Sequence, residues 1–378
     1  MKILHVIPYF TPKLGGDVNV CYHLCKHLVQ SGHEVTIITT DFKFDENYAN
    51  LLQGIEVIPF KCYFNFSKML ISPGMKKWLK KEIKNFDIIH LHDFRSYQNI
   101  IVHKLSIKNG VPYIIHGHGS VNRFGKKWLK FFYDVFWGYS ILKHAAGLVA
   151  VSNEESIHYK NMGADERKIK VIYNGVDTSN LIHNIKRGDF REKYNLRNTI
   201  ILYLGRIHKT KGLDFLLYAF SNVSDKIKST TDIVFVGSDE GYKKNLLKLG
   251  KKLHIENNLR FIGPVDEIEK ISAYIDSNLF VNPARYMAGV ALTTIEALLY
   301  NLPVITTAES GEIIQKAKAG YIVNYGEINE LRNKIEYALE NPDEIYELTN
   351  NGKKYIKENL SWNDVVRKIE KIYENCNC

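Results

Sequence analysis

Short apolar runs alternate with longer amphipathic segments along the first half of the chain. Helical patterns such as Asp17–Ser31, which carries Val20, Leu24 and Leu28 on one face, fall between most of these runs. Apolar strands without polar alternation, separated by helices, predict a parallel sheet that is covered on both faces. The runs interpreted as strands are Lys2–Tyr9, Glu34–Thr40, Gly54–Phe60, Phe86–Leu91, Val111–His116, Ala146–Ser152 and Ile169–Tyr173.

The second half repeats the pattern after a polar segment, Asp177–Lys193, where we place a domain boundary. The α/β fold is therefore predicted to comprise two Rossmann-like domains, residues 1–180 and 181–360, which face each other across a ligand-binding cleft. Residues 361–378 form an amphipathic helix and a tail, and we expect the helix to pack back towards the N-terminal domain. The second series of strands is Ile200–Leu204, Asp232–Gly237, Leu259–Ile262, Leu279–Val281, Pro303–Thr306 and Gly320–Val323.

One connection in the second half is typical of an anion-binding site. A buried strand ends at Gly205, and two cations, Arg206 and Lys211, follow on the loop. Gly212 then opens an apolar helix. Backbone N–H groups at a helix N-terminus, together with two fixed cations, suit a phosphate-bearing ligand. A solvated basic turn is the alternative.

Charge and cysteine content narrow the class of protein. The 378 residues carry a net charge of +10, and residues 1–180 hold 23 Lys and Arg against 15 Asp and Glu, which is +8 of that excess. An anionic substrate or a membrane surface is the expected partner of this half. We expect neither a secretory signal nor a transmembrane helix. Five cysteines without a pairing or zinc framework indicate reduced thiols and a cytoplasmic location.

Two common nucleotide-binding motifs are missing. The loop after the first strand, Lys13–Val18, reads KLGGDV and lacks the third glycine of the dinucleotide fingerprint GxGxxG. The phosphate-binding pattern GxxxxGK[ST] does not occur in the sequence. Nicotinamide-dependent dehydrogenases and P-loop nucleotidases are therefore disfavoured.

A series of motifs instead resembles the retaining family 4 glycosyltransferases, which have the GT-B fold. The pairing of GR…KG with a later EA…NLPV segment is the most specific part of the resemblance, which extends over almost the whole chain. The motifs, in the order and spacing of that family, are IPYFTPKLGGDVNV, HGHGS (His116–Ser120), AVSNEE (Ala150–Glu155), VIYNGVD (Val171–Asp177), LGRIHKTKGLDFLLYAF (Leu204–Phe220), FVGSDEGY (Phe235–Tyr242), FIGPV (Phe261–Val265) and IEALLYNLPVITT (Ile295–Thr307).

The resemblance implies transfer of a sugar from a UDP- or GDP-type nucleotide-diphosphate sugar. Arg206 and Lys211 would bind the diphosphate, where fixed cations stabilise the charge that grows on the leaving group. Gly15 and Gly16 would let the backbone of the other domain approach the phosphates, and Glu296 would accept the ribose hydroxyls. For the two glycines a plain tight turn is the alternative, and for Glu296 a solvated carboxylate.

The sugar end of the donor departs from the family pattern. The family carries a second Glu eight residues before Glu296, and Ala288 occupies that position here. Backbone N–H groups near Gly289 and Val290, at the start of the helix, are the substitutes we expect. The departure also motivates an alternative function, a catalytically weak protein that binds sugar-nucleotides or serves as a partner subunit.

Further candidates lie in the N-terminal half and near the hinge. The resemblance places His118 beside the donor sugar, as a positioning group or a partner for charge, and we expect His116 to point elsewhere if the segment is extended. Asn174 and Glu312 are secondary candidates, as a turn former near the hinge and as a helix cap or a lining of the sugar pocket. The HLHD run His90–Asp93 has ligand-type residues, but we interpret it as structural. No metal and no cofactor are expected.

The acceptor is expected at the N-terminal domain, as the family resemblance implies. Two segments, Lys61–Lys84 and Arg123–His144, combine lysines with aromatic residues and predict helices that contact a membrane surface. In the second segment an apolar stripe recurs at helical spacing, at Trp128, Phe132, Val135, Tyr139 and Leu142. The alternative is that these stripes pack on the domain. A glycan or lipid-linked acceptor is expected, and a nucleic acid is not, because no reader motif accompanies the charge.

Overall fold

The computed structural model describes residues 1–12, 14, 16–66, 69–123, 127–177, 185–285 and 291–376. The chain folds as two compact units, one made of Met1–Gly175 with Trp362–Cys378 and one made of Val176–Ser361. The change of unit falls a few residues before the predicted boundary, and the last helix belongs to the first unit. None of the described helices combines the length and apolar character that crossing a bilayer requires.

The first unit is built on a parallel sheet of seven strands in the order β3-β2-β1-β6-β7-β8-β9. Buried residues alternate between its faces, so that Ile3 and Ile88 belong to one core and Leu4 and Ile89 to the other. The strands are β1 (Lys2–Val6), β2 (Glu34–Thr40), β3 (Glu56–Phe60), β6 (Ile88–His92), β7 (Tyr113–His116), β8 (Gly147–Ala150) and β9 (Ile169–Val171).

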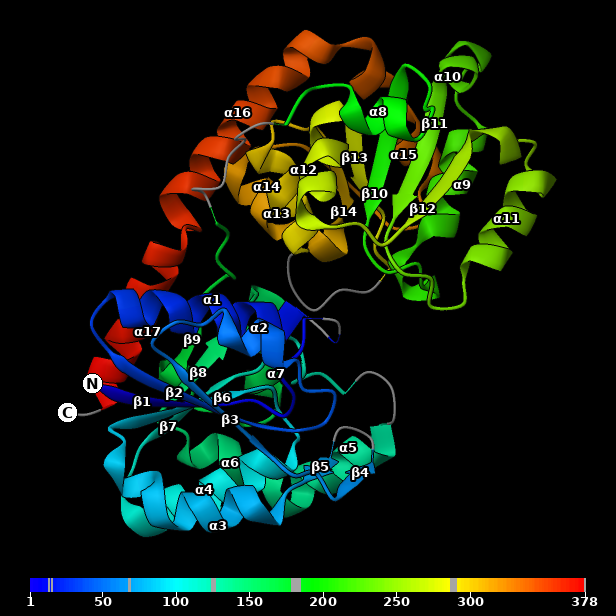
Figure 1. The fold of residues 1–378 in the computed structure, drawn as a ribbon. Helices are drawn as coiled ribbons and strands as arrows, with labels where there is room; N and C mark the ends of the chain where they lie inside the picture. The colour runs from blue at the N-terminus through cyan, green and yellow to red at the C-terminus, as the bar shows by residue number, and fades with distance from the viewer. Residues whose placement is uncertain are drawn as a thin grey trace. The chain divides into compact units, whose positions relative to one another are not determined.

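Helices cover both faces of this sheet (Figure 1). The core on one face includes residues of α1 and α17, and the core on the other includes residues of α3, α4 and α6. The C-terminal helix packs against α1, as the amphipathic pattern predicted. The helices of this unit are α1 (Gly16–Gln30), α2 (Glu46–Asn50), α3 (Pro73–Glu82), α4 (Tyr97–Asn109), α5 (Lys127–Tyr133), α6 (Tyr139–His144), α7 (Asn153–Asn161) and α17 (Trp362–Cys376).

The segment Lys61–Lys84 differs from its prediction as a basic helix. It begins with an antiparallel hairpin of two three-residue strands, β4 (Phe64–Phe66) and β5 (Met69–Ile71), and only then forms α3. Pro73 at the first helical position explains where α3 starts, since the fixed φ of proline suits a helix N-terminus. Met75 and Leu79 of α3 are buried in the core, so this helix packs on the domain.

The second unit has a parallel sheet of six strands in the order β12-β11-β10-β13-β14-β15. In sequence order this is 3-2-1-4-5-6, the strand order of Rossmann folds, in which ligands bind beyond the carboxyl ends of the strands where the order reverses. That reversal lies between β10 and β13. The strands are β10 (Thr199–Leu204), β11 (Thr231–Val236), β12 (Leu259–Gly263), β13 (Leu279–Asn282), β14 (Val304–Thr307) and β15 (Tyr321–Val323).

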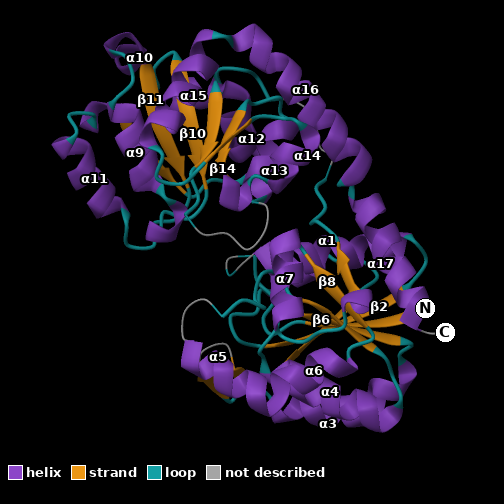
Figure 2. Cartoon of the chain, turned by 180° about the vertical axis from the view of Figure 1, so that it is seen from behind, coloured by secondary structure: helices purple, strands orange, loops and turns teal. Residues whose placement is uncertain are grey.

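Helices also cover both faces of the second sheet (Figure 2). Residues of α9, α11 and α15 share one core with inward-facing residues of β10 and β11, and α16 packs on α13 and α14. The two doubly wound parallel sheets confirm the predicted fold class. The helices are α8 (Asp189–Lys193), α9 (Leu213–Ser221), α10 (Asp225–Thr230), α11 (Lys243–Lys252), α12 (Glu267–Asp276), α13 (Leu292–Leu299), α14 (Glu312–Ala317), α15 (Ile328–Glu340) and α16 (Pro342–Asn359).

Candidate active site

The basic loop of the second unit follows β10, next to the point where the strand order reverses. Its glycines let backbones meet closely. A Cβ on Gly237 would lie 2.1 Å from the Gly205 carbonyl oxygen. Gly212 has a φ of +66°, and a Cβ there would lie 2.0 Å from the carbonyl oxygen of Pro283. Gly212 caps the N-terminus of α9, so the predicted strand, loop and helix are all present.

Arg206 on this loop already holds a carboxylate. Its Nη1 donates to both oxygens of Glu240, at 3.0 Å each. The Glu240 amide donates to the Ile207 carbonyl at 3.1 Å, so the loops after β10 and β11 are joined through their backbones as well. Sequence reasoning missed this partner, although Glu240 lies within the FVGSDEGY motif. A phosphate would compete with Glu240, because both are anions that a guanidinium group binds well.

Lys211 lies half-buried in the single turn Lys209–Lys211, just before Gly212. Burial lowers the pKa of Lys211, the positive charge of Arg206 lowers it further, and Glu240 acts in the opposite direction. The three side chains therefore form one electrostatic group, with both predicted cations in it. An anion bound beside Lys211 would stabilise the ammonium form, because opposite charge favours ionisation.

Glu296 lies on α13 and is held by two side chains of α12. Its Oε1 accepts a hydrogen bond from Lys270 Nζ at 3.0 Å, and its Oε2 accepts one from the Tyr274 hydroxyl at 2.8 Å. Burial opposes the charge of Lys270, but the nearby carboxylates of Glu296 and Glu267 raise its pKa. Sequence reasoning missed Lys270 and Tyr274. The carboxylate is thus fixed in position, and each oxygen keeps a lone pair that can accept a further hydroxyl.

Of the other residues predicted at the donor site, the structure describes only Gly16. Gly16 is the exposed first residue of α1, after the first strand, where the prediction placed it. Gly15, Ala288, Gly289 and Val290 lie outside the described residues.

His118 lies in the first unit, on the turn after β7. Its backbone has a φ of +50°, a left-handed conformation that is uncommon for residues other than glycine. Its Nε2 is 2.9 Å from His92 Nδ1, and its ring stacks on His116 with the centroids 3.9 Å apart. The prediction that His116 points elsewhere assumed an extended segment and is wrong, because the strand ends at His116 and the left-handed turn at His118 brings the two rings together.

Five histidines from three neighbouring strands and the turn after β7 form what we call the histidine cluster. His5 Nδ1 lies 2.9 Å from His92 Nε2, which continues the line of hydrogen bonds from His118. Burial lowers the pKa of His5 to about 3 and holds the pKa of His92 and His116 well below the usual value, so these rings are neutral. Sequence reasoning treated the HLHD run alone and missed the cluster, whose members are His5, His90, His92, His116 and His118.

Glu155 fixes the turn that carries His118. Its Oε1 accepts a hydrogen bond from the Gly119 amide at 2.6 Å, and its Oε2 accepts one from Val151 at 2.9 Å. A Cβ on Gly117 would lie 2.5 Å from Glu155 Oε1, so a side chain there would displace the carboxylate. Burial raises the pKa of Glu155 to about 7, against the effect of its backbone hydrogen bonds.

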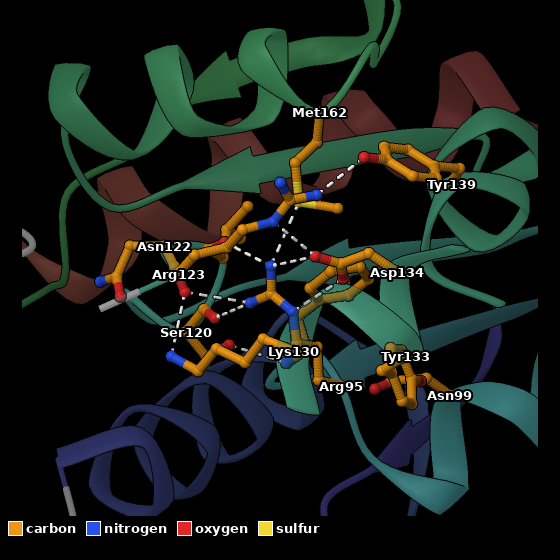
Figure 3. A network of polar contacts seen from close by, with 12 residues as sticks. Arg95, Asn99, Ser120, Asn122, Arg123, Lys130, Tyr133, Asp134, Tyr139 and Met162 are labelled. Carbon is orange, nitrogen blue, oxygen red and sulfur yellow. Dashed lines mark hydrogen bonds and ion pairs between the residues drawn. The ribbon is translucent and has the colours of Figure 1, made fainter. Parts of the chain in front are cut away.

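A buried arginine fixes the rest of this loop (Figure 3). Arg95 pairs with the fully buried Asp134 at 2.8 Å. Its other N–H groups donate to the carbonyl oxygens of Ser120 at 2.7 Å, Val121 at 2.9 Å and Asn122 at 3.1 Å. Sequence reasoning missed this network. It joins Arg95 to two other segments, around Ser120–Asn122 and Asp134, which no local pattern relates.

The two secondary candidates, Asn174 and Glu312, both lie within the described residues. Asn174 lies half-buried in the irregular stretch after β9, and its Oδ1 is buried without a hydrogen-bond partner. Glu312 is the first residue of α14 and accepts a hydrogen bond from Lys316 at 3.1 Å. An acidic residue in the first turn is favourable to the helix dipole, so Glu312 has at least this structural role.

The apolar stripe of Arg123–His144 lies largely on the surface. Of its five residues only Leu142 is buried, while Trp128, Phe132, Val135 and Tyr139 are exposed. Phe136 is 67% exposed and adds to this patch. The alternative of a stripe packed on the domain therefore fails for most of its members.

Comparison with known proteins supports one family over nearly the whole chain. Residues 14–180 match the family model described as Glycosyltransferase Family 4, and residues 186–358 match Glycosyl transferases group 1. An uncharacterized glycosyltransferase of Methanocaldococcus jannaschii, MJ1607, is 24% identical over 99% of this chain and 98% of its own length. The O-antigen biosynthesis glycosyltransferase WclY of Escherichia coli is 25% identical over 81% of this chain and 80% of its own.

Solved structures share the fold. Anabaena HepE in complex with UDP superposes with a TM-score of 0.81 at 18% identity, covering 99% of this chain and all of the other. WaaG, a glycosyltransferase involved in lipopolysaccharide biosynthesis, gives 0.70 at 17% identity and covers 98% of this chain and 99% of the other. With the family motifs in place on both units, the chain belongs to the glycosyltransferases that combine a family 4 N-terminal part with a group 1 C-terminal part.

Proposed function

We propose that this glycosyltransferase moves a sugar from a UDP-type nucleotide-diphosphate sugar to a glycan or lipid-linked acceptor, with retention of the anomeric configuration. The observation that carries the proposal is the pair of cations, Arg206 and Lys211, on a glycine-bounded loop next to the sheet's reversal point. The UDP complex of HepE supports the choice of base. The hexosyl group is suggested by the UDP-glucose complex of the same protein.

The chemistry assigned to each residue follows from charge. Breaking the bond between the anomeric carbon and the phosphate oxygen leaves negative charge on the diphosphate, which Arg206 and Lys211 stabilise. Binding of the diphosphate displaces Glu240 from Arg206. Glu296, held by α12, accepts the ribose hydroxyls, and His118 positions the donor sugar. In this mechanism the leaving phosphate takes the acceptor proton, and the fixed cations make a resident metal unnecessary.

Replacing either cation tests the site. We expect Arg206→Ala and Lys211→Ala each to reduce the release of UDP from UDP-sugars at least about 100-fold, the range seen when one group that stabilises developing charge is removed. Lys209→Ala is the matched control, since Lys209 is an exposed lysine of the same turn. Activity unchanged in both site variants would refute the assignment. A native chain that binds UDP-sugar, but neither hydrolyses nor transfers it, would favour the non-catalytic alternative.

We further propose that the acceptor lies at a membrane surface, contacted by the exposed aromatic residues of α5 and the turn after it. Trp128 and Phe136 are 64% and 67% exposed, and Lys127 directly precedes Trp128 in the sequence. Aromatic side chains with flanking lysines suit an anionic lipid interface. A cytoplasmic location, expected from the cysteines, stays a prediction; Cys21, Cys25, Cys62 and Cys376 carry free thiols among the described residues.

Sedimentation with vesicles tests the membrane contact. The protein should sediment with vesicles that contain acidic lipid, less so without acidic lipid or at high salt. Replacing Trp128 and Phe136 with serine should abolish sedimentation, because both side chains are expected to insert at the interface. Ile268→Ser, at a position 68% exposed in the second unit, is the control for lost surface hydrophobicity. Salt-insensitive binding, or binding that survives the double replacement, would contradict the proposal.

A further inference from the structure

The histidine cluster contains a set of three ring nitrogens with metal-ligand spacing. His92 and His116 are register partners on the neighbouring strands β6 and β7, and His118 follows two residues later. One ring nitrogen from each of these three residues lies within 4.8 Å of the other two. One histidine at the end of β6 and a His-x-His pair at the end of the adjacent parallel strand β7 thus place three ring nitrogens close together.

His116 shows that this set is not satisfied by hydrogen bonds alone. Its side chain is 1% exposed, and neither ring nitrogen has a hydrogen-bond partner. A buried polar group left unpaired destabilises the folded chain, so such a ring in a core needs an explanation.

The geometry requires little rearrangement for an ion to enter. His92 Nδ1 and His118 Nε2 face each other at 2.9 Å across a hydrogen bond. Two nitrogens about 2.0–2.1 Å from a tetrahedral ion lie about 3.3–3.4 Å apart, so the rings would separate slightly as the ion enters. The proton of their hydrogen bond would move to the other nitrogen of its own ring, which leaves both ligating nitrogens unprotonated. His92 Nε2 keeps its contact with His5 Nδ1, which orients the ring as an outer partner does in metal sites. The half-buried His118 offers access from solvent.

The ligand set selects the class of ion. Three imidazoles without a carboxylate suit zinc, nickel, cobalt or copper(II), whereas magnesium and calcium require oxygen ligands. An ion held by His118 would also engage the ring that we assign to the donor sugar. Such an ion would therefore compete with the donor and would not assist the transfer.

We propose that His92, His116 and His118 bind one divalent transition-metal ion, and that this ion withdraws His118 from the donor sugar. The second half of the proposal rests on the proposed function, while the first half stands on the geometry alone.

Calorimetric titration of the metal-stripped, untagged full chain with zinc chloride tests the site. We expect one zinc ion per chain and at least a tenfold loss of affinity in His116→Ala. His118→Asn is a second variant with the same expected loss, and it keeps a residue that tolerates positive φ. His254→Asn is the control, because His254 is an exposed histidine of the second unit. Circular dichroism identifies any variant that fails to fold. Wild-type protein that binds no zinc, or folded variants that bind it equally well, would overturn the site.

Donor binding measured with and without zinc tests the second half. Zinc should weaken the binding of UDP-glucose to the wild type at least tenfold and leave the donor affinity of His116→Ala unchanged. One zinc ion bound with no effect on donor affinity would overturn the competition. If UDP-glucose and other nucleotide-sugars do not bind at all, the proposed function fails, and the zinc titration still decides whether the metal site exists.

Discussion

Glu155 is the single residue whose ionisation should most affect the turn that carries His118. Burial raises its pKa from 4.5 to about 7, and the charge of Glu154 adds to this effect. Such a carboxyl is protonated in the folded chain at pH values where the unfolded chain has already lost the proton. The stability that it contributes is fully present below about pH 4.5 and is lost as pH rises to about 7.

Glu155→Gln tests this dependence. The window spans about 2.5 pH units, each worth about 1.4 kcal/mol, so the wild type should lose about 3 kcal/mol more than the variant between pH 4.5 and 7.5. The free energy of unfolding of both proteins, measured across this range, checks the expectation, since all other titrating groups are common to both. Parallel profiles would contradict it and would mean that the amides of Val151 and Gly119 keep Glu155 ionised.

Individual candidate residues were predictable where the signal is local. Arg206, Lys211 and Gly212 lie within seven residues of one another, and a strand, a basic loop and a helix suffice to predict an anion site. Glu240 and Lys270 were missed because they reach their partners from other elements. A side-chain pair formed by the tertiary fold leaves no spacing in the sequence by which it can be recognised.

At the scale of elements, a short π-helix follows α5. Asp134–Gly138 (η2) is a π-helix that joins α5 to α6 and carries the buried partner of Arg95. A Cβ on Gly138 would lie 2.8 Å from Asp134 Oδ1, so glycine makes room for the carboxylate. The helical period was predictable here, but the π-turn was not, because Asp134 pairs there with a residue 39 positions away in the sequence. The hairpin of β4 and β5 was missed since three-residue strands are too short to show a period.

Arg95→Met tests how strongly this turn and the loop Ser120–Asn122 depend on the buried pair. Removing one partner leaves Asp134 buried with Arg123 alone, so we expect a loss of about 3 kcal/mol or more in the free energy of unfolding. Arg167→Met is the matched control, because its ion pair with Asp165 is on the surface and should contribute nothing measurable. Equal effects of the two replacements, measured by denaturant unfolding, would contradict this account.

At the scale of the whole molecule, the end of the chain completes the unit in which the chain begins. Trp362 of α17 stacks on His23 of α1 with the ring centroids 5.3 Å apart, and the Tyr373 hydroxyl lies 2.6 Å from His90 Nδ1. The amphipathic pattern and the family resemblance made the destination of this helix predictable. The contact of this helix with the histidine cluster was not predictable, because Tyr373 and His90 lie 283 positions apart and only the tertiary fold brings them together.

Ile369→Ala tests whether the two units depend on α17 to different degrees. The side chain is fully buried in the core that α17 shares with α1, so its truncation should cost about 2–5 kcal/mol. Because Ile369 belongs to the first unit, hydrogen exchange should accelerate within Met1–Gly175 and stay unchanged within Val176–Ser361. Lys371→Ala, at an exposed position of the same helix, should leave both unchanged. Equal loss of protection in both units would mean that they unfold as one. It would contradict the expectation that the first unit, with His118, and the second unit, with Arg206, unfold separately.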